Sequence, residues 1–229
     1  MRILFLIPAR SGSKGLPGKN TKLLGAKTLI EYSIDFALEN FTNSDELCIS
    51  TNDDLVLEIA KKRGITIPFI RPDQLSNDTA SSYDVIMHAL NHYETMNKKF
   101  DAVLLLQPTS PFRKNEDLQS LIKEFDKNVD MVVSVKIAKE NPYFTLFENS
   151  SDGFIEKSKL GLFDRRQDTP EVYAFNGSMY LISVDSLKKS KLGDFKKIKK
   201  IIMPEERSVD IDTLADWSLA EFYLKNENG

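Results

Sequence analysis

The sequence predicts an α/β fold in which a mostly parallel sheet is flanked by helices. Ile3–Ile7 and Asp101–Leu106 contain short apolar runs, which are typical of strands buried on both faces. Stretches with helical spacing of apolar residues, such as Leu29–Phe41 and Asn115–Phe125, alternate with the strands. This alternation is the pattern of α/β proteins, and 229 residues suffice for one well-buried core. We therefore expect residues 1–229 to form a single domain.

The composition is that of an ordinary globular protein, with 41% hydrophobic and 28% charged residues. The sequence has no apolar run of the length that a membrane span needs, and the apolar N-terminal run is too short for a signal peptide. The single cysteine, Cys48, cannot form an internal disulfide, which fits a reducing compartment. We expect a cytoplasmic protein that associates with no membrane.

A basic, glycine-rich loop follows the first predicted strand. Pro8 ends the strand, and glycines then recur at three-residue intervals, which lets the backbone turn sharply and approach a ligand closely. No acidic residue precedes Glu31, although the net charge of the chain is −3. Backbone N–H groups and cations that converge in this way indicate a phosphate-binding loop. The glycines are Gly12, Gly15 and Gly18, and the cations are Arg10, Lys14, Lys19 and Lys22.

Two standard phosphate-binding motifs do not fit this loop. A P-loop that began at Gly12 would need its second glycine where Pro17 stands, and Lys19 is followed by Asn20 instead of Ser or Thr. The dinucleotide fingerprint fails because the spacing is Gly-x-x-Gly-x-x-Gly. The loop is therefore either a phosphate cradle of another kind or a basic surface turn.

The next stretches supply the second strand and its helix. Glu46–Ser50 is expected to be a short strand, and Leu55–Lys62 a helix that ends at Gly64. Ile65–Ile70 is extended, and Pro68 makes it an edge or irregular strand.

A capped helix follows, with Arg71 before it. Ser76–Thr79 is rich in capping residues, and the apolar stripe of the helix lies within Val85–Leu90. Taken by themselves, these residues favour a capped helix with a surface arginine, Arg71.

A polar string follows the buried strand Asp101–Leu106. It reads Gln-Pro-Thr-Ser-Pro-Phe-Arg from Gln107 to Arg113. Ligands of open α/β sheets bind beyond the carboxyl ends of the strands, so this string is a candidate part of a site. The alternative is a turn that Pro108 and Pro111 shape on the way into the next helix.

The regular pattern breaks after the predicted strand Val129–Lys136. Residues 141–166 carry several aromatic side chains without helical spacing, and Ser151–Gly153 supplies a turn, as in a hairpin-like excursion from the sheet. Exposed aromatic side chains favour a subunit contact. We expect 141–166 to be an inserted dimerisation segment.

Two charged stretches lie near the C-terminus. Lys188–Lys200 contains seven lysines but only one aromatic residue, Phe195, which favours a solvated surface helix and turn over a nucleic-acid site. In an extended segment Asp210 and Asp212 point to one face, and paired carboxylates suit Mg²⁺. The alternative is that Asp212 caps the helix that starts at Thr213.

Four of these stretches resemble, in order, the signatures of the CMP-sialic acid synthetases (acylneuraminate cytidylyltransferases). They are the N-terminal loop and the stretches that contain Arg71, Gln107 and Asp210. Ser11–Gly15 is similar to the sialic type rather than to the related Kdo cytidylyltransferases. The resemblance covers nearly the whole chain. It implies a Rossmann-like nucleotidyltransferase fold and a homodimer in which residues 141–166 of each subunit reach over the partner's active site.

The resemblance also implies roles for individual residues. The residues that would hold CTP are Ala9, Arg10, Gly12, Lys19, Asn20, Arg71, Ser81 and Ser82. Those that would contact the sugar acid are Gln107, Arg165, Arg166, Gln167, Asn176 and Tyr180, with one arginine of the pair on its carboxylate. The catalytic residues would be Arg10, Lys19, Asp210 and Asp212, of which the two aspartates would hold Mg²⁺. Arg113 would help to hold the site or serve the fold alone.

The implied reaction is attack of the anomeric hydroxyl of a sialic acid on the α-phosphate of CTP, which releases pyrophosphate. N-acetylneuraminate is the default sugar, and legionaminate, pseudaminate and deaminated neuraminate are the alternatives. A sugar-nucleotide glycosyltransferase is a more distant alternative, but its Asp-x-Asp usually lies mid-chain. A non-catalytic nucleotide-binding regulator is a second one, and the presence of Lys19, Asp210 and Asp212 argues against it.

Overall fold

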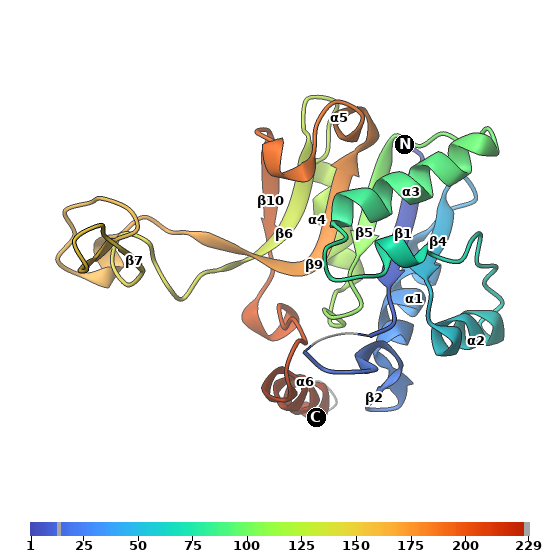
Figure 1. Ribbon diagram of the computed structural model, residues 1–229, viewed down its shortest axis with the longest axis horizontal. Helices are drawn as coiled ribbons and strands as arrows, with labels where there is room; N and C mark the ends of the chain where they lie inside the picture. The colour runs from blue at the N-terminus through green and yellow to red at the C-terminus, as the bar shows by residue number, and fades with distance from the viewer. Residues whose placement is uncertain (13–14, 227–229) are drawn as a thin grey trace.

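The computed structural model describes residues 1–12 and 15–226, so Lys14 of the basic loop lies outside the described residues. A six-stranded sheet forms the centre of the molecule, in the order β10-β6-β9-β5-β1-β4 (Figure 1). Its strands are β1 (Ile3–Ala9), β4 (Glu46–Thr51), β5 (Ala102–Leu106), β6 (Met131–Ile137), β9 (Tyr173–Ser183) and β10 (Ile198–Ile202).

The sheet is mostly parallel, as the sequence predicts. β1 pairs in parallel with both β4 and β5, and β10 pairs in parallel with β6. β9 runs antiparallel between β5 and β6 and joins the two parallel groups. The carboxyl ends of β1, β4 and β5 therefore meet at one edge of the sheet, where ligands of α/β proteins bind.

Helices cover both faces of the sheet, which confirms the expected layers (Figure 1). Alternate residues of β1 enter different cores: Phe5 packs with Ile34 of α1 (Leu29–Asn40) and Leu118 of α4 (Asn115–Glu124), whereas Leu6 packs with Ile86 of α3 (Ser82–Thr95). No helix in the described part of the chain has the length and apolarity of a membrane span. The helices are α1 (Leu29–Asn40), α2 (Asp54–Lys62), α3 (Ser82–Thr95), α4 (Asn115–Glu124), α5 (Val184–Leu187) and α6 (Leu214–Asn226).

A third, smaller core joins the two ends of the chain. Leu16 of the N-terminal loop and Leu24 of the short hairpin β2 (Leu23–Leu24) and β3 (Lys27–Thr28) pack with Ile211 and Trp217. This core holds the basic loop against the start of α6.

The lysine-rich stretch differs from the prediction of a surface helix and turn. Residues 198–202, which begin within that stretch and continue beyond it, form β10, an edge strand of the sheet. Ile201 is buried against the core while the neighbouring lysines stay exposed. The strand pairs with β6 and buries Ile201, an apolar residue that follows the lysines in the sequence. The expectation of a helix there was wrong.

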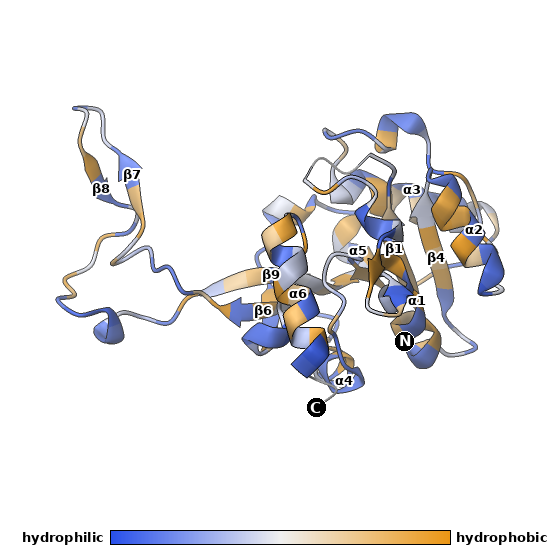
Figure 2. Cartoon of the chain, turned by 90° about the horizontal axis from the view of Figure 1, so that it is seen from below, coloured by the Kyte–Doolittle hydropathy of each residue, from blue (hydrophilic) through white to orange (hydrophobic). Residues whose placement is uncertain are grey.

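Residues 138–172, here called the arm, leave the sheet between β6 and β9 and extend away from the body (Figures 1 and 2). The arm contains the predicted excursion 141–166 and carries the two-stranded hairpin β7 (Phe147–Asn149) and β8 (Ile155–Lys157). Several of its apolar side chains are open to solvent, with Leu160 91% and Leu162 103% exposed. Apolar groups so exposed gain free energy when another surface covers them.

Candidate active site

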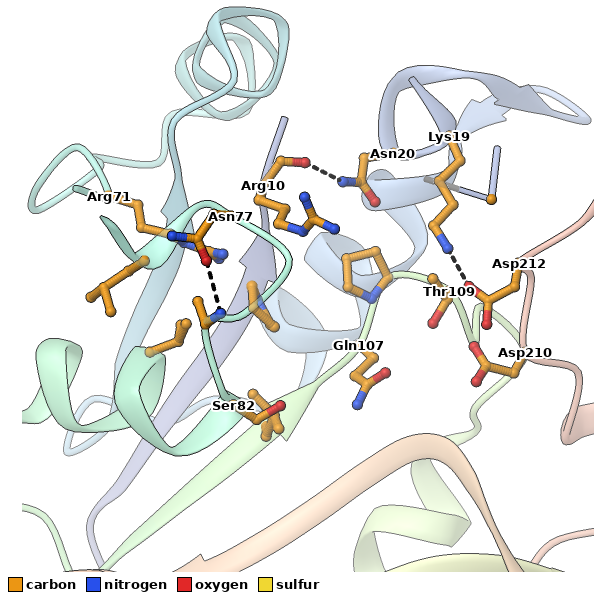
Figure 3. A pocket seen from close by; sticks show the side chains of 17 residues that line it. Arg10, Lys19, Asn20, Arg71, Asn77, Ser82, Gln107, Thr109, Asp210 and Asp212 are labelled. Atoms are coloured by element: carbon orange, nitrogen blue, oxygen red, sulfur yellow. Dashed lines mark hydrogen bonds and ion pairs between the residues drawn. The ribbon is translucent and has the colours of Figure 1, made fainter. Parts of the chain in front are cut away.

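A cavity of about 380 Å³ lies at the carboxyl ends of β1 and β5. Four separate stretches of the chain line it, including both the N-terminal loop and the segment before α6 (Figure 3). The residues predicted for a site that line it are Arg10, Lys19, Asn20, Arg71, Ser82, Gln107, Asp210 and Asp212.

Lys19 joins the two ends of the chain inside this cavity. Its side chain is buried, and Nζ donates to the carbonyl of Ile211 at 2.8 Å and to Asp212 Oδ1 at 2.6 Å. The loop backbone lies against the same segment, because a Cβ at Gly15 would clash with the carbonyl oxygen of Asp212. Glycine is therefore required at position 15 for this close approach.

Two arginines stand on the other side of the cavity. Arg10 pairs with Asp78 at 2.6 Å and donates to the carbonyl of Gly12 at 3.1 Å. Arg71 is only 4% exposed, and its Nε donates to Ser50 Oγ at 3.0 Å at the end of β4. Burial lowers the pKa of Arg71 to about 10, with a further contribution from the charge of Arg10. The guanidinium stays charged at neutral pH and is held in one orientation.

Asp210 lines the cavity, and its surroundings disfavour the charged form of its carboxylate. The residue is exposed to solvent, yet surrounding protein atoms desolvate its carboxylate, and this desolvation raises its pKa. The negative charge of Asp212 raises it further, whereas a hydrogen bond from Thr109 and the charge of Lys19 oppose the rise. A cation that binds here would relieve the repulsion between the two carboxylates.

The helix-capping alternative for Asp212 does not hold in the structure. Thr213 caps α6 instead: its Oγ1 accepts from the backbone N–H of Asp216 at 3.3 Å, and Asp216 Oδ2 accepts from the N–H of Thr213 at 2.8 Å. The side chain of Asp212 is left to pair with Lys19 and is otherwise 67% exposed.

Asp210 and Asp212 fit a magnesium ion whose other ligands are phosphate oxygens and water. Among residues 1–12 and 15–226, no group of three or more His, Cys, Asp or Glu side chains could enclose a metal. Asp210 and Asp212 supply oxygen ligands alone, which Mg²⁺ prefers, and phosphates and water complete such sites. The pair therefore fits Mg²⁺ held jointly with a phosphorylated ligand.

Several residues predicted for the nucleotide do not line the cavity. Ala9 is the last residue of β1. The carbonyl of Gly12 accepts a hydrogen bond from the guanidinium of Arg10. Ser81 caps α3 and accepts from the N–H of Asp84 at 3.2 Å. Of these three residues, Gly12 and Ser81 hold neighbouring groups of the chain in this structure.

Arg113 is a fixed part of the fold. It is buried, and its guanidinium donates to Ser33 Oγ at 2.8 Å, to Ser178 Oγ at 3.3 Å and to carbonyls of its own loop. These bonds hold the stretch that follows Gln107 in place. Of the two roles that the sequence left open for Arg113, this is the one in the fold.

The residues predicted to contact the sugar are divided between the body and the arm. Gln107 lines the cavity, whereas Arg165 pairs with Asp168 at 2.8 Å on the arm. Arg166 and Gln167 line a separate cavity of about 390 Å³ at the base of the arm. The structure therefore does not bring these three residues together with Gln107 within one chain.

Asn176 and Tyr180 of β9 lie behind the cavity. Asn176 is 1% exposed, and its amide accepts from Ser134 Oγ at 2.7 Å and donates to Ser208 Oγ at 3.0 Å. A direct sugar contact would require this amide to leave its partners. Tyr180 is half-buried, and burial together with the nearby charge of Asp210 raises its pKa.

Sequence reasoning missed Asn77 and Thr109, which both line the cavity. Asn77 Oδ1 accepts from the N–H groups of Thr79 and Ala80 at 3.0 Å each, which shapes the loop before α3. Asn77 lies in the stretch read only as capping residues, and Thr109 lies within the Gln107–Arg113 string. Asparagine and threonine are common in loops, so their presence alone does not indicate a ligand contact.

Three curated relatives match almost the whole chain. A family model described as Cytidylyltransferase matches residues 4–213. The CMP-N,N'-diacetyllegionaminic acid synthase of Legionella pneumophila is 33% identical over 96% of this chain and 95% of its own length. The pseudaminic acid cytidylyltransferase of Campylobacter jejuni is 31% identical, over 98% and 97%. The N-acylneuraminate cytidylyltransferase of Streptococcus agalactiae is 34% identical over 95% of this chain but 52% of its own length.

A solved structure shares the fold. CMP:2-keto-3-deoxy-manno-octonic acid synthetase in complex with CTP matches 99% of this chain and 100% of its own, with a TM-score of 0.69 and 16% identity. The sequence relatives and the solved structure point to the same family as the motifs that line the cavity. The chain belongs to the cytidylyltransferase family and, within it, to the CMP-sialic acid synthetases.

Proposed function

We propose that the protein transfers CMP from CTP to the anomeric hydroxyl of a nonulosonic acid, with release of pyrophosphate. The observation that carries the proposal is the cavity in which Arg10 and Lys19 face Asp210 and Asp212 (Figure 3). Phosphoryl transfer of this type depends on positioning and on neutralisation of charge more than on covalent help from the protein. Cations and a carboxylate pair on one cavity supply both.

In the proposed complex the two ends of the chain act on the triphosphate. Lys19 neutralises the α-phosphate, and Arg10 moves from Asp78 to the departing pyrophosphate. Asp210 and Asp212 would hold Mg²⁺, which would supply charge neutralisation at the phosphate oxygens. Asp212 would then share its carboxylate between the ion and Lys19.

The nucleoside occupies the side of the cavity that Arg71 and Ser82 line. Arg71 is immobilised by Ser50 and donates to the cytosine carbonyl, and the hydroxyl of Ser82 contacts the ribose. The apolar side chains of Leu75 and Val85 line the same side and offer contact area to a base ring. Gln107 contacts the sugar acid.

The sugar is proposed at the level of its class. The relatives are named for N-acylneuraminate, legionaminic acid and pseudaminic acid, and these names support the three sugars equally. We keep N-acetylneuraminate as the reference substrate and treat the others as outcomes of the assay. Discrimination among them depends on a few pocket contacts.

We also propose a homodimer in a cytoplasmic setting. Burial of the arm's apolar side chains in a second copy would stabilise the assembly. The same contact would carry Arg165, Arg166 and Gln167 of one subunit to the cavity of its partner, where an arginine can pair with the sugar carboxylate through two hydrogen bonds.

Pyrophosphate release tests the proposal. Purified protein is incubated with Mg²⁺, CTP and each of N-acetylneuraminate, N,N'-diacetyllegionaminate, pseudaminate and deaminated neuraminate, with UTP and ATP as control nucleotides. Release that requires CTP and one of these sugars supports the function and names the sugar. Release that is equally strong with UTP or ATP in place of CTP, or no release with any pair, contradicts it.

A further inference from the structure

The carboxylate of Asp210 lies directly against β9. Gly177 has a φ of +76°, and a Cβ at this position would lie 3.0 Å from Asp210 Oδ2 and 3.1 Å from Ser110 Oγ. A side chain there would push its neighbours by a few tenths of an ångström. Glycine at position 177 therefore permits the present position of the carboxylate.

Buried hydrogen bonds hold together the three segments that meet behind this carboxylate. Asn176 Nδ2 donates to Ser208 Oγ at 3.0 Å, which ties β9 to the segment before α6. Ser110 Oγ donates to the carbonyl of Asn176 at 3.1 Å. The N–H of Ile211 donates to the carbonyl of Thr109 at 2.8 Å. The backbone around the carboxylate is thus fixed from three sides.

We propose that Gly177 and Asn176 are positioning residues for Asp210. Gly177 leaves the space that the carboxylate occupies, and Asn176 fixes the segment that carries it through Ser208. The inference rests on the proposed function, in which Asp210 is a ligand of Mg²⁺. Residues that orient a metal ligand typically change metal affinity or activity by about 10- to 100-fold when altered. Asn176 acts through Asp210 and needs no contact with the sugar.

Gly177→Ala is the first test, with Gly64→Ala as its matched control. Gly64 has a φ of +72°, and nothing lies within 4 Å of a Cβ built there, so alanine brings the same backbone strain without a contact. Mn²⁺ is titrated into each protein saturated with CTP, followed by electron paramagnetic resonance, with CTP alone as the blank. The kcat of CMP transfer is measured in parallel.

We expect Gly177→Ala to weaken Mn²⁺ binding and lower kcat by about tenfold each. Gly64→Ala should leave both within about twofold of the wild-type protein, at a similar loss of melting temperature. Wild-type values for Gly177→Ala, or equal losses in both variants, would overturn the proposal. The Mn²⁺ titration needs no sugar, so it decides the inference even where the sugar assay fails.

Ser208→Ala serves where Gly177→Ala does not fold. It removes the hydroxyl that accepts from Asn176 and leaves the backbone free of strain. Mn²⁺ binding should weaken about threefold or more while the KM for the sugar stays unchanged, because the bond acts on the metal ligand alone. A raised KM for the sugar with unchanged Mn²⁺ affinity would instead make Asn176 a substrate contact and end the proposal.

Discussion

The cavity and the arm differ in how much of their structure one chain completes. Around the cavity, Lys19 and Arg71 are less than a tenth exposed, and both are held by hydrogen bonds within the chain. On the arm, Leu160 and Leu162 are almost fully exposed. A charged group is positioned by enclosure in its own fold, whereas an exposed apolar side chain gains when a second surface covers it. The cavity proposed for the nucleotide is therefore preorganised, and we expect the proposed sugar side to be completed by a second copy.

Lys19→Ala tests the preorganised side and carries the largest expected effect. The variant removes the cation proposed at the α-phosphate, so kcat should fall by roughly a hundredfold or more, as for the loss of one electrostatic stabiliser. Steady-state assays with saturating CTP measure it. Lys22→Ala is the control, because Lys22 of the same stretch packs over the Trp217 ring at 4.4 Å and does not line the cavity. Near-full turnover by Lys19→Ala would remove the role of this lysine.

A double substitution on the arm tests the open side. Leu160→Ser with Leu162→Ser should weaken the dimer by about a hundredfold or more, since each leucine loses about 1.5–3 kcal/mol of burial. Light scattering over a dilution series measures the dissociation constant. Phe222→Ser is the control, because Phe222 is an apolar residue of α6 that is 59% exposed on the body. An unchanged dissociation constant in the arm variant, or a wild-type monomer, contradicts the proposed dimer.

Asp78→Asn sharpens the comparison at the mouth of the cavity. Arg10 must leave its ion pair with Asp78 to reach a phosphate, so the variant should bind CTP about threefold more tightly, within the range of exposed pairs. Isothermal titration calorimetry measures the affinity. Asp54→Asn on α2 makes the same change of net charge away from the cavity. Weaker binding by Asp78→Asn would show that this carboxylate contributes to nucleotide binding.

Asp210→Asn should change the free energy of unfolding only slightly. The expected change at neutral pH is a gain, whereas the loss of a carboxylate with a lowered pKa is destabilising. Because the folded-state pKa of Asp210 is raised, its contribution to the free energy of unfolding falls as pH rises through the interval above the ordinary carboxyl pKa. The metal-free variant should melt at or above the wild-type temperature at pH 7, and the difference should shrink at acid pH. Its magnesium-dependent activity should be lost.

Asp126→Asn is the reference of opposite sign for this measurement. The pKa of Asp126 is lowered by the N–H of Asn128 and by Lys199, so its contribution is present at neutral pH and lost in acid. Calorimetry of both variants without divalent cations checks the pair. A melting temperature of Asp210→Asn clearly below that of the wild-type protein at pH 7 would contradict the assigned shift.

Local patterns were sufficient to predict most of the sheet and the polar lining of the cavity. Apolar runs predicted β1 and β5, and residues at their carboxyl ends lie at one edge because parallel strands align there. That Lys19 and Asp212 belong to one site was expected only through the family resemblance, since nothing local in the sequence joins the two ends of the chain, and their direct ion pair was not predicted. The third core brings them together.

The orientation of Asn176 could not be predicted, for a reason visible in β9. In a regular strand Asn176 and Tyr180 would share a face. The pairing with β6 shifts between Val133 and Val135, and Gly177 adopts a positive φ at this irregularity. The shift turns Asn176 into the core. Side-chain alternation gave no sign of it, although the Asn-Gly pair itself is a signal of irregular backbone.

A crystal structure with CTP and Mg²⁺ tests the central claim most directly. We expect the α-phosphate to lie between Lys19 Nζ and a metal ion on Asp210 and Asp212, with the cytosine on the side of Arg71. A nucleotide bound outside this cavity, or a metal ion held by neither aspartate, would contradict it.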